Sequence, residues 1–317
     1  MNHKQPLSEK IDAVVKLYSN GQIQQALDTI IAMSKDHPNE PILLNISGAC
    51  YAGLSLMKDA VKCYKKAVTI KPDYADAHYN LGNILRDLGE LNSAIKSYSK
   101  ALKIMPDYYE AEYNLAVTLQ ELKQLDESIE HYEKALSINP SNDELLINLG
   151  LIYQDLGHID TAIDYYEKAL NLNPDNVKAL NNLGVIFRDI GQLDDSIKYY
   201  KKALKIKPDY ADVHYNLGFV YSDLGRIDEA NEQYEQAIVI NDHAKAYHNL
   251  SYVKKYKPND PQISRIQLLL SSDDLLLSER IQLNLALARV NEGLGKQDEF
   301  FKHLDEGNRL QKKELNY

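Results

Sequence analysis

Six asparagines recur through the sequence at a nearly constant interval. The first five are spaced by 34 residues and the last by 33: Asn80, Asn114, Asn148, Asn182, Asn216 and Asn249. Asparagine is a mediocre helix former, so its return inside segments with a helical pattern indicates a particular task. A primary amide offers N–H donors and a carbonyl acceptor, and it can therefore pair with a peptide backbone whatever that peptide's side chains are.

Apolar and aromatic side chains accompany these amides. They precede an asparagine by one position or follow it by three: Tyr79, Tyr113, Tyr215, Val117, Leu151, Val185 and Phe219. A surface that mixes apolar groups with amides suits a peptide. If successive helices lie roughly 10 Å apart and an extended peptide rises about 3.3–3.6 Å per residue, each amide meets about every third ligand residue. We therefore predict a peptide-binding surface along this column.

The rest of the sequence offers no chemistry of comparable quality. The string GLGK (293–296) lacks the glycine spacing of a phosphate-binding loop, and Gln297 follows its lysine. His78 and His214 are equivalent positions in distant parts of the chain, too far apart to share an ion on helices about 8–10 Å apart. No nucleophile-and-base arrangement is evident. We predict a chain that is not an enzyme and that binds no metal and no cofactor.

The composition is that of a folded, acidic protein. The 317 residues are 26% charged and 44% apolar, with a formal net charge of −10. Nucleic-acid binders carry a basic face, so nucleic acid and anionic membranes are poor candidate partners. The two cysteines give no disulfide framework, and no segment is long and apolar enough for a signal peptide or a membrane span. We expect a cytoplasmic protein whose partner is a protein or a peptide.

A repeat of 34 residues must position these side chains. Prolines mark its period: Pro38, Pro72, Pro106, Pro140, Pro174 and Pro208. Each unit is predicted to contain two helices, for example 75–87 and 91–104, with Gly89 in the turn because glycine tolerates positive φ. The proline stops the second helix, and an aspartate such as Asp107 is expected to cap the helix that follows.

This pattern resembles the tetratricopeptide repeat family. The similar features are a leucine–glycine pair in the first helix, an alanine and an aromatic residue in the second, then an alanine and a final proline. The resemblance covers seven units: 7–40, 41–74, 75–108, 109–142, 143–176, 177–210 and 211–243. It implies an all-α, right-handed superhelical solenoid whose first helices line the concave side, so that the asparagines face a groove. The ladder of amides resembles that of the O-linked N-acetylglucosamine transferases.

Residues 244–317 are predicted to form a partial eighth repeat and a divergent helical C-terminal cap. A helix pair is expected over 278–313, with Ser278 as its cap and a turn at Gly293–Gly295. The segment 275–317 resembles the junction between tetratricopeptide repeats and a sulfotransferase domain in bacterial proteins. That resemblance implies either a fragment of a longer enzyme or a stand-alone relative that lacks the catalytic domain.

Three functions are compatible with these observations. The first is a protein–protein interaction scaffold that binds a peptide or partner segment in the concave groove through the asparagine ladder. The second is the substrate-docking region of a larger sulfotransferase or glycosyltransferase. The third is a scaffold that associates with itself. For the asparagines there is also a structural alternative, in which the amides only tie neighbouring helices together.

Overall fold

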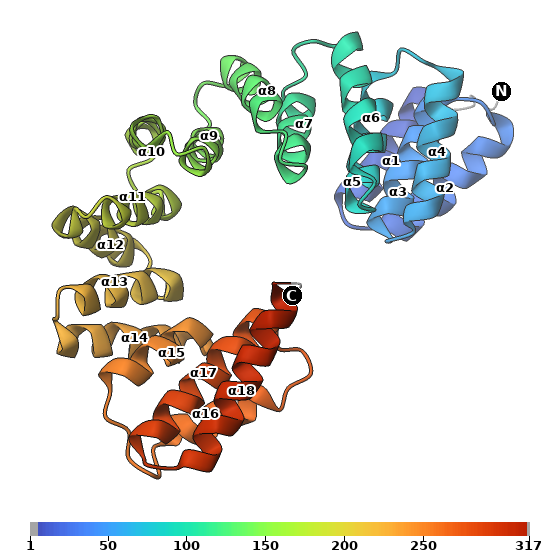
Figure 1. Ribbon diagram of the computed structural model, residues 1–317. Helices are drawn as coiled ribbons and strands as arrows, with labels where there is room; N and C mark the ends of the chain where they lie inside the picture. Colours follow the sequence, from blue (N-terminus) through green and yellow to red (C-terminus); the bar gives the residue numbers. More distant parts are fainter. Residues whose placement is uncertain (1–5, 316–317) are drawn as a thin grey trace. The chain divides into compact units, whose positions relative to one another are not determined.

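The computed structural model describes residues 6–315, and all of its regular structure is α-helical (Figure 1). These residues form eighteen helices and no strand, so the prediction of an all-α fold is confirmed. The ends of the chain, 1–5 and 316–317, lie outside the described part, and with them the last two residues of the predicted cap. The helices divide into two compact units, one ending at Ile152 and the other beginning at Tyr153.

In the first unit each helix from α1 to α7 packs on the helix that follows it in the chain, so the consecutive packing ends with α8 on α7. Short turns join the two helices of each hairpin, as in α5 with α6 (Figure 1). The helices are α1 (Leu7–Ser19), α2 (Ile23–Asp36), α3 (Pro41–Gly53), α4 (Met57–Ile70), α5 (Ala75–Asp87), α6 (Leu91–Ile104), α7 (Tyr109–Glu121), α8 (Leu125–Ile138) and α9 (Asp143–Asp155), whose last residues belong to the second unit.

The second unit continues the same order of hairpins and then departs from it. Helices α10 to α14 pack consecutively, α15 packs on both α14 and α17, and α17 pairs with α18. The helices are α10 (Ile159–Leu172), α11 (Val177–Asp189), α12 (Leu193–Ile206), α13 (Ala211–Asp223), α14 (Ile227–Asn241), α15 (Ala244–Val253), α16 (Pro261–Leu270), α17 (Leu277–Gly293) and α18 (Gln297–Glu314).

The turn inside each hairpin is closed by two backbone hydrogen bonds around a residue with positive φ. At the end of α5, Gly89 has φ +74° and donates to Arg86 O at 2.8 Å, while Glu90 N–H donates to Leu85 O at 2.8 Å. This is the Schellman arrangement, which satisfies carbonyls that the helix end leaves open. Where the sequence lacks glycine, a non-glycine residue such as Lys123 adopts φ +61° in the same place.

The aspartate caps predicted for the first helices are wrong. Asp107 lies one residue before Tyr108, the N-cap of α7, whose side chain makes no capping bond. Pro106 follows the end of α6 and lies inside a tight turn, in which Tyr108 N–H donates to Met105 O at 3.2 Å. Because of this turn, Asp107 stands one position too early to cap α7. Helix α11 is different, because the Asn176 side chain accepts bonds from two N–H groups of its first turn.

Tyrosines of the second helices pack directly on the backbone of the first helices. A Cβ atom built on Gly82 would lie 2.5 Å from Cε1 of Tyr98, which is 0% exposed. In the second unit a Cβ on Gly218 would lie 2.8 Å from Cδ1 of Tyr234. Ordinary van der Waals separation is about 3.5–4.0 Å between carbons. The glycines at these positions therefore make room for a ring and do not serve a turn.

The C-terminal hairpin turns where the sequence predicted. Gly293 is the last residue of α17 and Gly295 has φ +70°, so the GLGK string is an interhelical turn. The prediction that Ser278 caps α17 is wrong, because the N-cap residue is Leu276. The carboxylate of Glu279 accepts a bond from Leu276 N–H at 3.1 Å and caps the first turn instead.

Replacing Gly82 with alanine tests the close packing of ring and backbone. Overpacking costs about 1–3 kcal/mol, and the better helix propensity of alanine offsets up to about 1 kcal/mol of that. We expect Gly82→Ala to lower the urea midpoint, measured by far-UV circular dichroism. Gly293→Ala is the control, since the Cβ atom of an alanine at this position would meet no other side chain or backbone within 4 Å. Equal midpoints for the two variants would contradict the packing argument.

One buried histidine, His78, and two partly buried ones, His248 and His303, should make stability depend on pH. Burial lowers the pKa of His78, His248 and His303. The folded chain therefore binds fewer protons than the unfolded chain once the pH falls below about 6.5, and stability decreases as the pH drops through that window. The urea midpoint should be lower at about pH 5.5 than at about pH 7.5. Replacing all three histidines with glutamine should shrink this difference, and an unchanged difference would contradict their role.

Candidate peptide-binding surface

The predicted surface residues all lie on the first helices of the hairpins, from α5 to α15. Every one of them is partly buried except Leu151, which is exposed. The leucine that follows each asparagine is buried, as Leu81 and Leu217 illustrate. One step along a helix rotates the side chain by about 100°. The leucine therefore holds the helix in the core, and the asparagine is presented at the edge of that core.

In the first unit each asparagine amide bonds to a side chain one repeat earlier in the chain. Asn80 Nδ2 donates to Asn45 Oδ1 at 3.0 Å. Asn114 Nδ2 donates to the hydroxyl of Tyr79 at 3.0 Å, and Asn148 is hydrogen-bonded to Tyr113. These partners occupy one column of the repeat, directly before the asparagine column. The amides therefore link first helix to first helix.

The second unit repeats this link at two of its asparagines. Asn216 Nδ2 donates to Asn181 Oδ1 at 3.2 Å, and Asn249 Nδ2 donates to the hydroxyl of Tyr215 at 3.4 Å. Asn182 differs, because its Oδ1 accepts a bond from its neighbour Asn181 at 3.4 Å and its side chain lies beside the hydroxyl of Tyr166. The structural role that the sequence left as an alternative is thus part of the observed geometry.

These bonds use only part of what each amide offers. A primary amide has two N–H donors and a carbonyl oxygen with two acceptor positions, and a single bond through Nδ2 leaves the others for a ligand. Asn114 is the most occupied member, because its Nδ2 also donates to Asn83 Oδ1 at 3.1 Å and its Oδ1 accepts from Arg86 at 3.2 Å. Asn80 and Asn216 keep more capacity than Asn114.

Buried tyrosines of the second helices form a floor beneath this surface. Their hydroxyls reach the first helices: Tyr98 donates to Asn83 Oδ1 at 2.8 Å and Tyr166 donates to Gln154 Oε1 at 3.0 Å. Burial raises the pKa of Tyr234 to about 12, so its hydroxyl stays protonated near neutrality. The hydroxyl of Tyr200 is buried near Ser196 and makes no hydrogen bond of normal geometry with any described residue.

One cavity opens on this surface in the second unit. It has a volume of about 140 Å³ and is lined by Phe219, Ser222, Tyr234, Asn249 and Tyr252. Phe219 and Asn249 were predicted from the sequence as surface residues, whereas Ser222, Tyr234 and Tyr252 were not. Ser222 lies three positions after Phe219 on α13, and Tyr252 three positions after Asn249 on α15, so helical spacing could have identified both.

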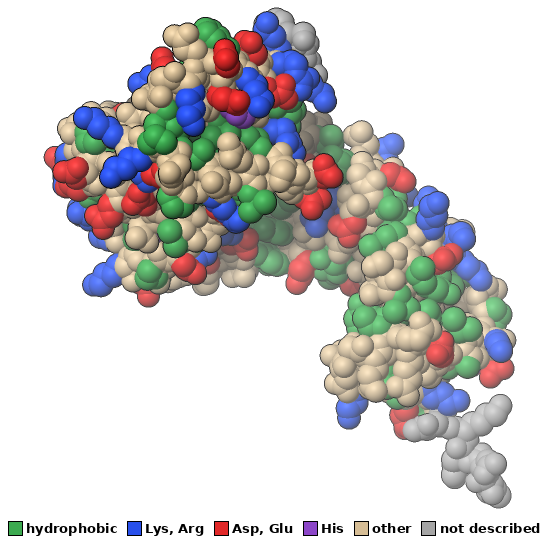
Figure 2. All heavy atoms as spheres, turned by 90° about the horizontal axis from the view of Figure 1, so that it is seen from below, with side chains coloured by type: hydrophobic (Ala, Val, Ile, Leu, Met, Phe, Trp, Pro, Cys, Tyr) green, Lys and Arg blue, Asp and Glu red, His purple; other side chains and the backbone are tan. Residues whose placement is uncertain are grey.

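Charged side chains of both signs are mixed with one another and with hydrophobic ones on the face of the molecule that Figure 2 shows. Arg188 contacts both Asp189, at 2.7 Å, and the ring of Phe219, 5.5 Å from its centroid. Within residues 6–315, no three His, Cys, Asp or Glu side chains are grouped so as to hold a metal. In the same part of the chain no helix combines the length and the apolar character that a bilayer crossing requires.

Family models for this repeat match the chain in overlapping segments from residue 57 to residue 244, which is more than half of its length. A model described as TPR repeat matches 57–85, 82–123 and 184–225. Models described as tetratricopeptide repeat match 107–175, 165–198 and 211–244.

Individual proteins resemble the chain over shorter stretches. It is 35% identical over 68 residues to the peroxisomal targeting signal receptor of Candida albicans, and 29% identical over 72 residues to that of Candida glabrata. These matches cover 22% and 23% of this chain and only 12% of each receptor.

Two solved structures are similar to parts of this chain. The APC/C hetero-tetramer Cut9–Hcn1 matches 78% of this chain and 49% of its own, with a TM-score of 0.55 at 18% identity. YrrB, described as a TPR protein with an unusual peptide-binding site, matches 60% of this chain and 98% of its own, with a TM-score of 0.49 at 27% identity. The first of these likenesses supports the helical repeat fold.

Two tyrosine-to-phenylalanine variants test the floor of the surface. Tyr98→Phe removes a hydroxyl that donates a hydrogen bond, and we expect a loss of about 0.5–1.5 kcal/mol in the free energy of unfolding. Tyr200→Phe removes a buried hydroxyl that makes no hydrogen bond of normal geometry with any described residue, so stability should stay the same or rise. Urea titration of both variants measures the difference. An equal loss in both would show that Tyr200 has a partner after all.

Proposed function

The chain belongs to the tetratricopeptide repeat family, and from that premise we propose that it is a scaffold that binds an extended peptide segment of a protein partner. Within each unit the binding surface is formed by the predicted residues of its first helices, with Asn80, Asn114 and Asn148 in the first unit and Asn182, Asn216 and Asn249 in the second. Receptors for a targeting signal share part of this repeat array, which supports a peptide as the type of ligand.

The observation that carries this proposal is the remaining hydrogen-bonding capacity of amides that are already held in place. Asn216 is fixed by its bond to Asn181, so little side-chain entropy is lost when its other N–H group and its oxygen meet a ligand. In the second unit Phe219 and Tyr252 offer apolar surface around the 140 Å³ cavity that Asn249 also lines. Amides that pair with a backbone and a cavity that accepts a side chain are the two elements of peptide recognition.

A matched pair of variants separates the structural role of the amides from ligand binding. Asn181→Ala and Asn216→Ala remove the same interhelical hydrogen bond, and only the second removes the amide of the asparagine column. We expect both variants to lose about 0.5–1.5 kcal/mol of stability. Asn216→Ala should also weaken peptide binding by about tenfold, for a loss of about 1.4 kcal/mol. Asn181→Ala frees the amide of Asn216 but leaves it in place, so it should weaken peptide binding much less.

The ligand for this test comes from selecting a phage-displayed library of random peptides on the intact chain. Selected peptides are then titrated into both variants by fluorescence anisotropy, and thermal unfolding is recorded in parallel. Equal affinities for Asn181→Ala and Asn216→Ala would leave the amides with a structural role alone. Failure to select any peptide would contradict the proposed function itself.

A further inference from the structure

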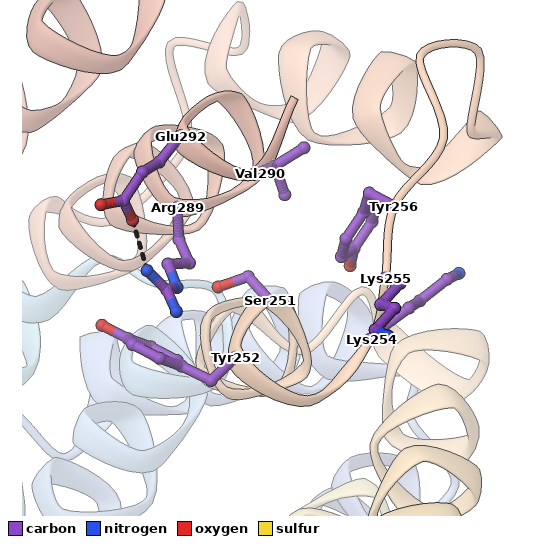
Figure 3. Close-up of a pocket in the computed structure, with 9 residues that line it drawn as sticks. Ser251, Tyr252, Lys254, Lys255, Tyr256, Arg289, Val290 and Glu292 are labelled. Carbon is purple, nitrogen blue, oxygen red and sulfur yellow. Dashed lines mark hydrogen bonds and ion pairs between the residues drawn. The ribbon is translucent and has the colours of Figure 1, made fainter. Parts of the chain in front are cut away.

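A larger cavity lies in the C-terminal part of the second unit, where α15 ends. It has a volume of about 520 Å³ and lies between the end of α15, the connection 254–256 and the C-terminal end of α17. Figure 3 shows Arg289 extending from α17 toward Tyr252 and Ser251, with Tyr256 and Val290 on the other side of the opening. The size of this cavity is that of sites that hold a side chain or a small ligand.

The charges around this cavity leave one lysine unpaired. Arg289 forms an ion pair with Glu292, and its guanidinium also lies 5.2 Å from the ring centroid of Tyr252. Lys254 is held by two carboxylates, those of Glu235 at 3.3 Å and Asp260 at 3.2 Å. Lys255 is exposed and forms no ion pair with any described residue.

Three cations, Arg289, Lys254 and Lys255, and one carboxylate, Glu292, line this cavity. Glu235 and Asp260, which pair with Lys254, balance the charges around it, and Lys255 is the cation that has no ion-pair partner among the described residues. Arg289 is prepared for an anion, because the ring of Tyr252 and the carboxylate of Glu292 hold its planar group in place. The uncharged polar groups are less available. The hydroxyl of Ser251 donates to His248 O at 2.6 Å, and that of Tyr256 donates to Gln262 Oε1 at 3.0 Å.

Tyr252 joins this cavity to the candidate peptide-binding surface. It lines both the 520 Å³ cavity and the 140 Å³ cavity that contains Phe219 and Asn249. Its ring is 59% exposed, and its hydroxyl lies 3.3 Å from His248 Nε2. A ligand that fills the smaller cavity therefore lies directly beside the larger one.

We infer that the larger cavity binds an acidic side chain, aspartate or glutamate, of the same peptide whose neighbouring apolar side chain fills the smaller cavity. This inference rests on the proposed function. A carboxylate can accept paired, charge-assisted hydrogen bonds from the guanidinium of Arg289, while Lys255 is a further cation in the lining of the cavity. Lys255 has no ion-pair partner among the described residues, so it can balance a single negative charge, whereas a phosphate dianion would meet Glu292 without a second free cation.

The test uses the random-peptide selection on the intact chain and on the variants Arg289→Gln and Lys255→Ala. Peptides selected on the unmodified chain should be enriched in aspartate or glutamate beside a large apolar residue. That enrichment should disappear on both variants. For one selected peptide, changing its acidic residue to the corresponding amide should weaken binding to the unmodified chain about tenfold, and should have little further effect on Arg289→Gln.

Arg309→Gln is the control, because Arg309 forms an equivalent ion pair with Glu306 three residues away on α18, outside this cavity. It should leave both the enrichment and the affinity unchanged. If Arg289→Gln fails to fold, Lys255→Ala still tests the site, because Lys255 has no ion-pair partner to lose among the described residues. Thermal unfolding of every variant verifies that it is folded.

Two failures are distinguishable. If peptides bind and depend on Asn216 but show no acidic preference, or if Arg289→Gln and Lys255→Ala bind them as the unmodified chain does, the acidic site is wrong and the proposed function stands. If no peptide is selected at all, both are overturned.

Discussion

The contact between a tyrosine ring and the backbone of a glycine sets the geometry on which the rest of this structure depends. Because Gly82 has no side chain, the ring of Tyr98 lies against the first helix and is completely buried. Its hydroxyl donates to Asn83 of the same helix, which in turn accepts a bond from Asn114 of the next hairpin. A packing contact inside one hairpin thus continues as hydrogen bonds to the next.

The asparagines can serve two purposes because their two ends are used differently. An interhelical hydrogen bond contributes only about 0.5–1.5 kcal/mol net, so such a bond does not require the whole amide. It does fix the rotamer of the side chain, as the bond from Asn216 to Asn181 does. A fixed amide loses less entropy when it binds. The structural and the ligand-binding interpretations of the column therefore support each other.

Much of this arrangement could be predicted from the sequence, because a fixed period places equivalent residues in equivalent positions. The helices and the turn at Gly89 follow from that period, and the face that carries the asparagines was implied by the resemblance to the repeat family. The period does not say which side chain of a neighbouring repeat an amide reaches, since that depends on how adjacent helices are rotated. Asn45 and Asn181 were missed for this reason. The cap at Asp107 failed because a turn after the proline displaces the helix start by one residue.

The C-terminal part shows how a change in one hairpin creates a cavity. Its last hairpin keeps the register of the others, since His303 on α18 bonds Asn284 on α17 nineteen positions earlier, as His214 bonds Gln233 across the same interval. What changes is α15, which has 10 residues where α13 has 13. The chain leaves at Lys254, so α15 packs on α17 and lacks a second helix joined to it by a short turn. The space beside that early end is the cavity that Tyr252, Lys255 and Arg289 line.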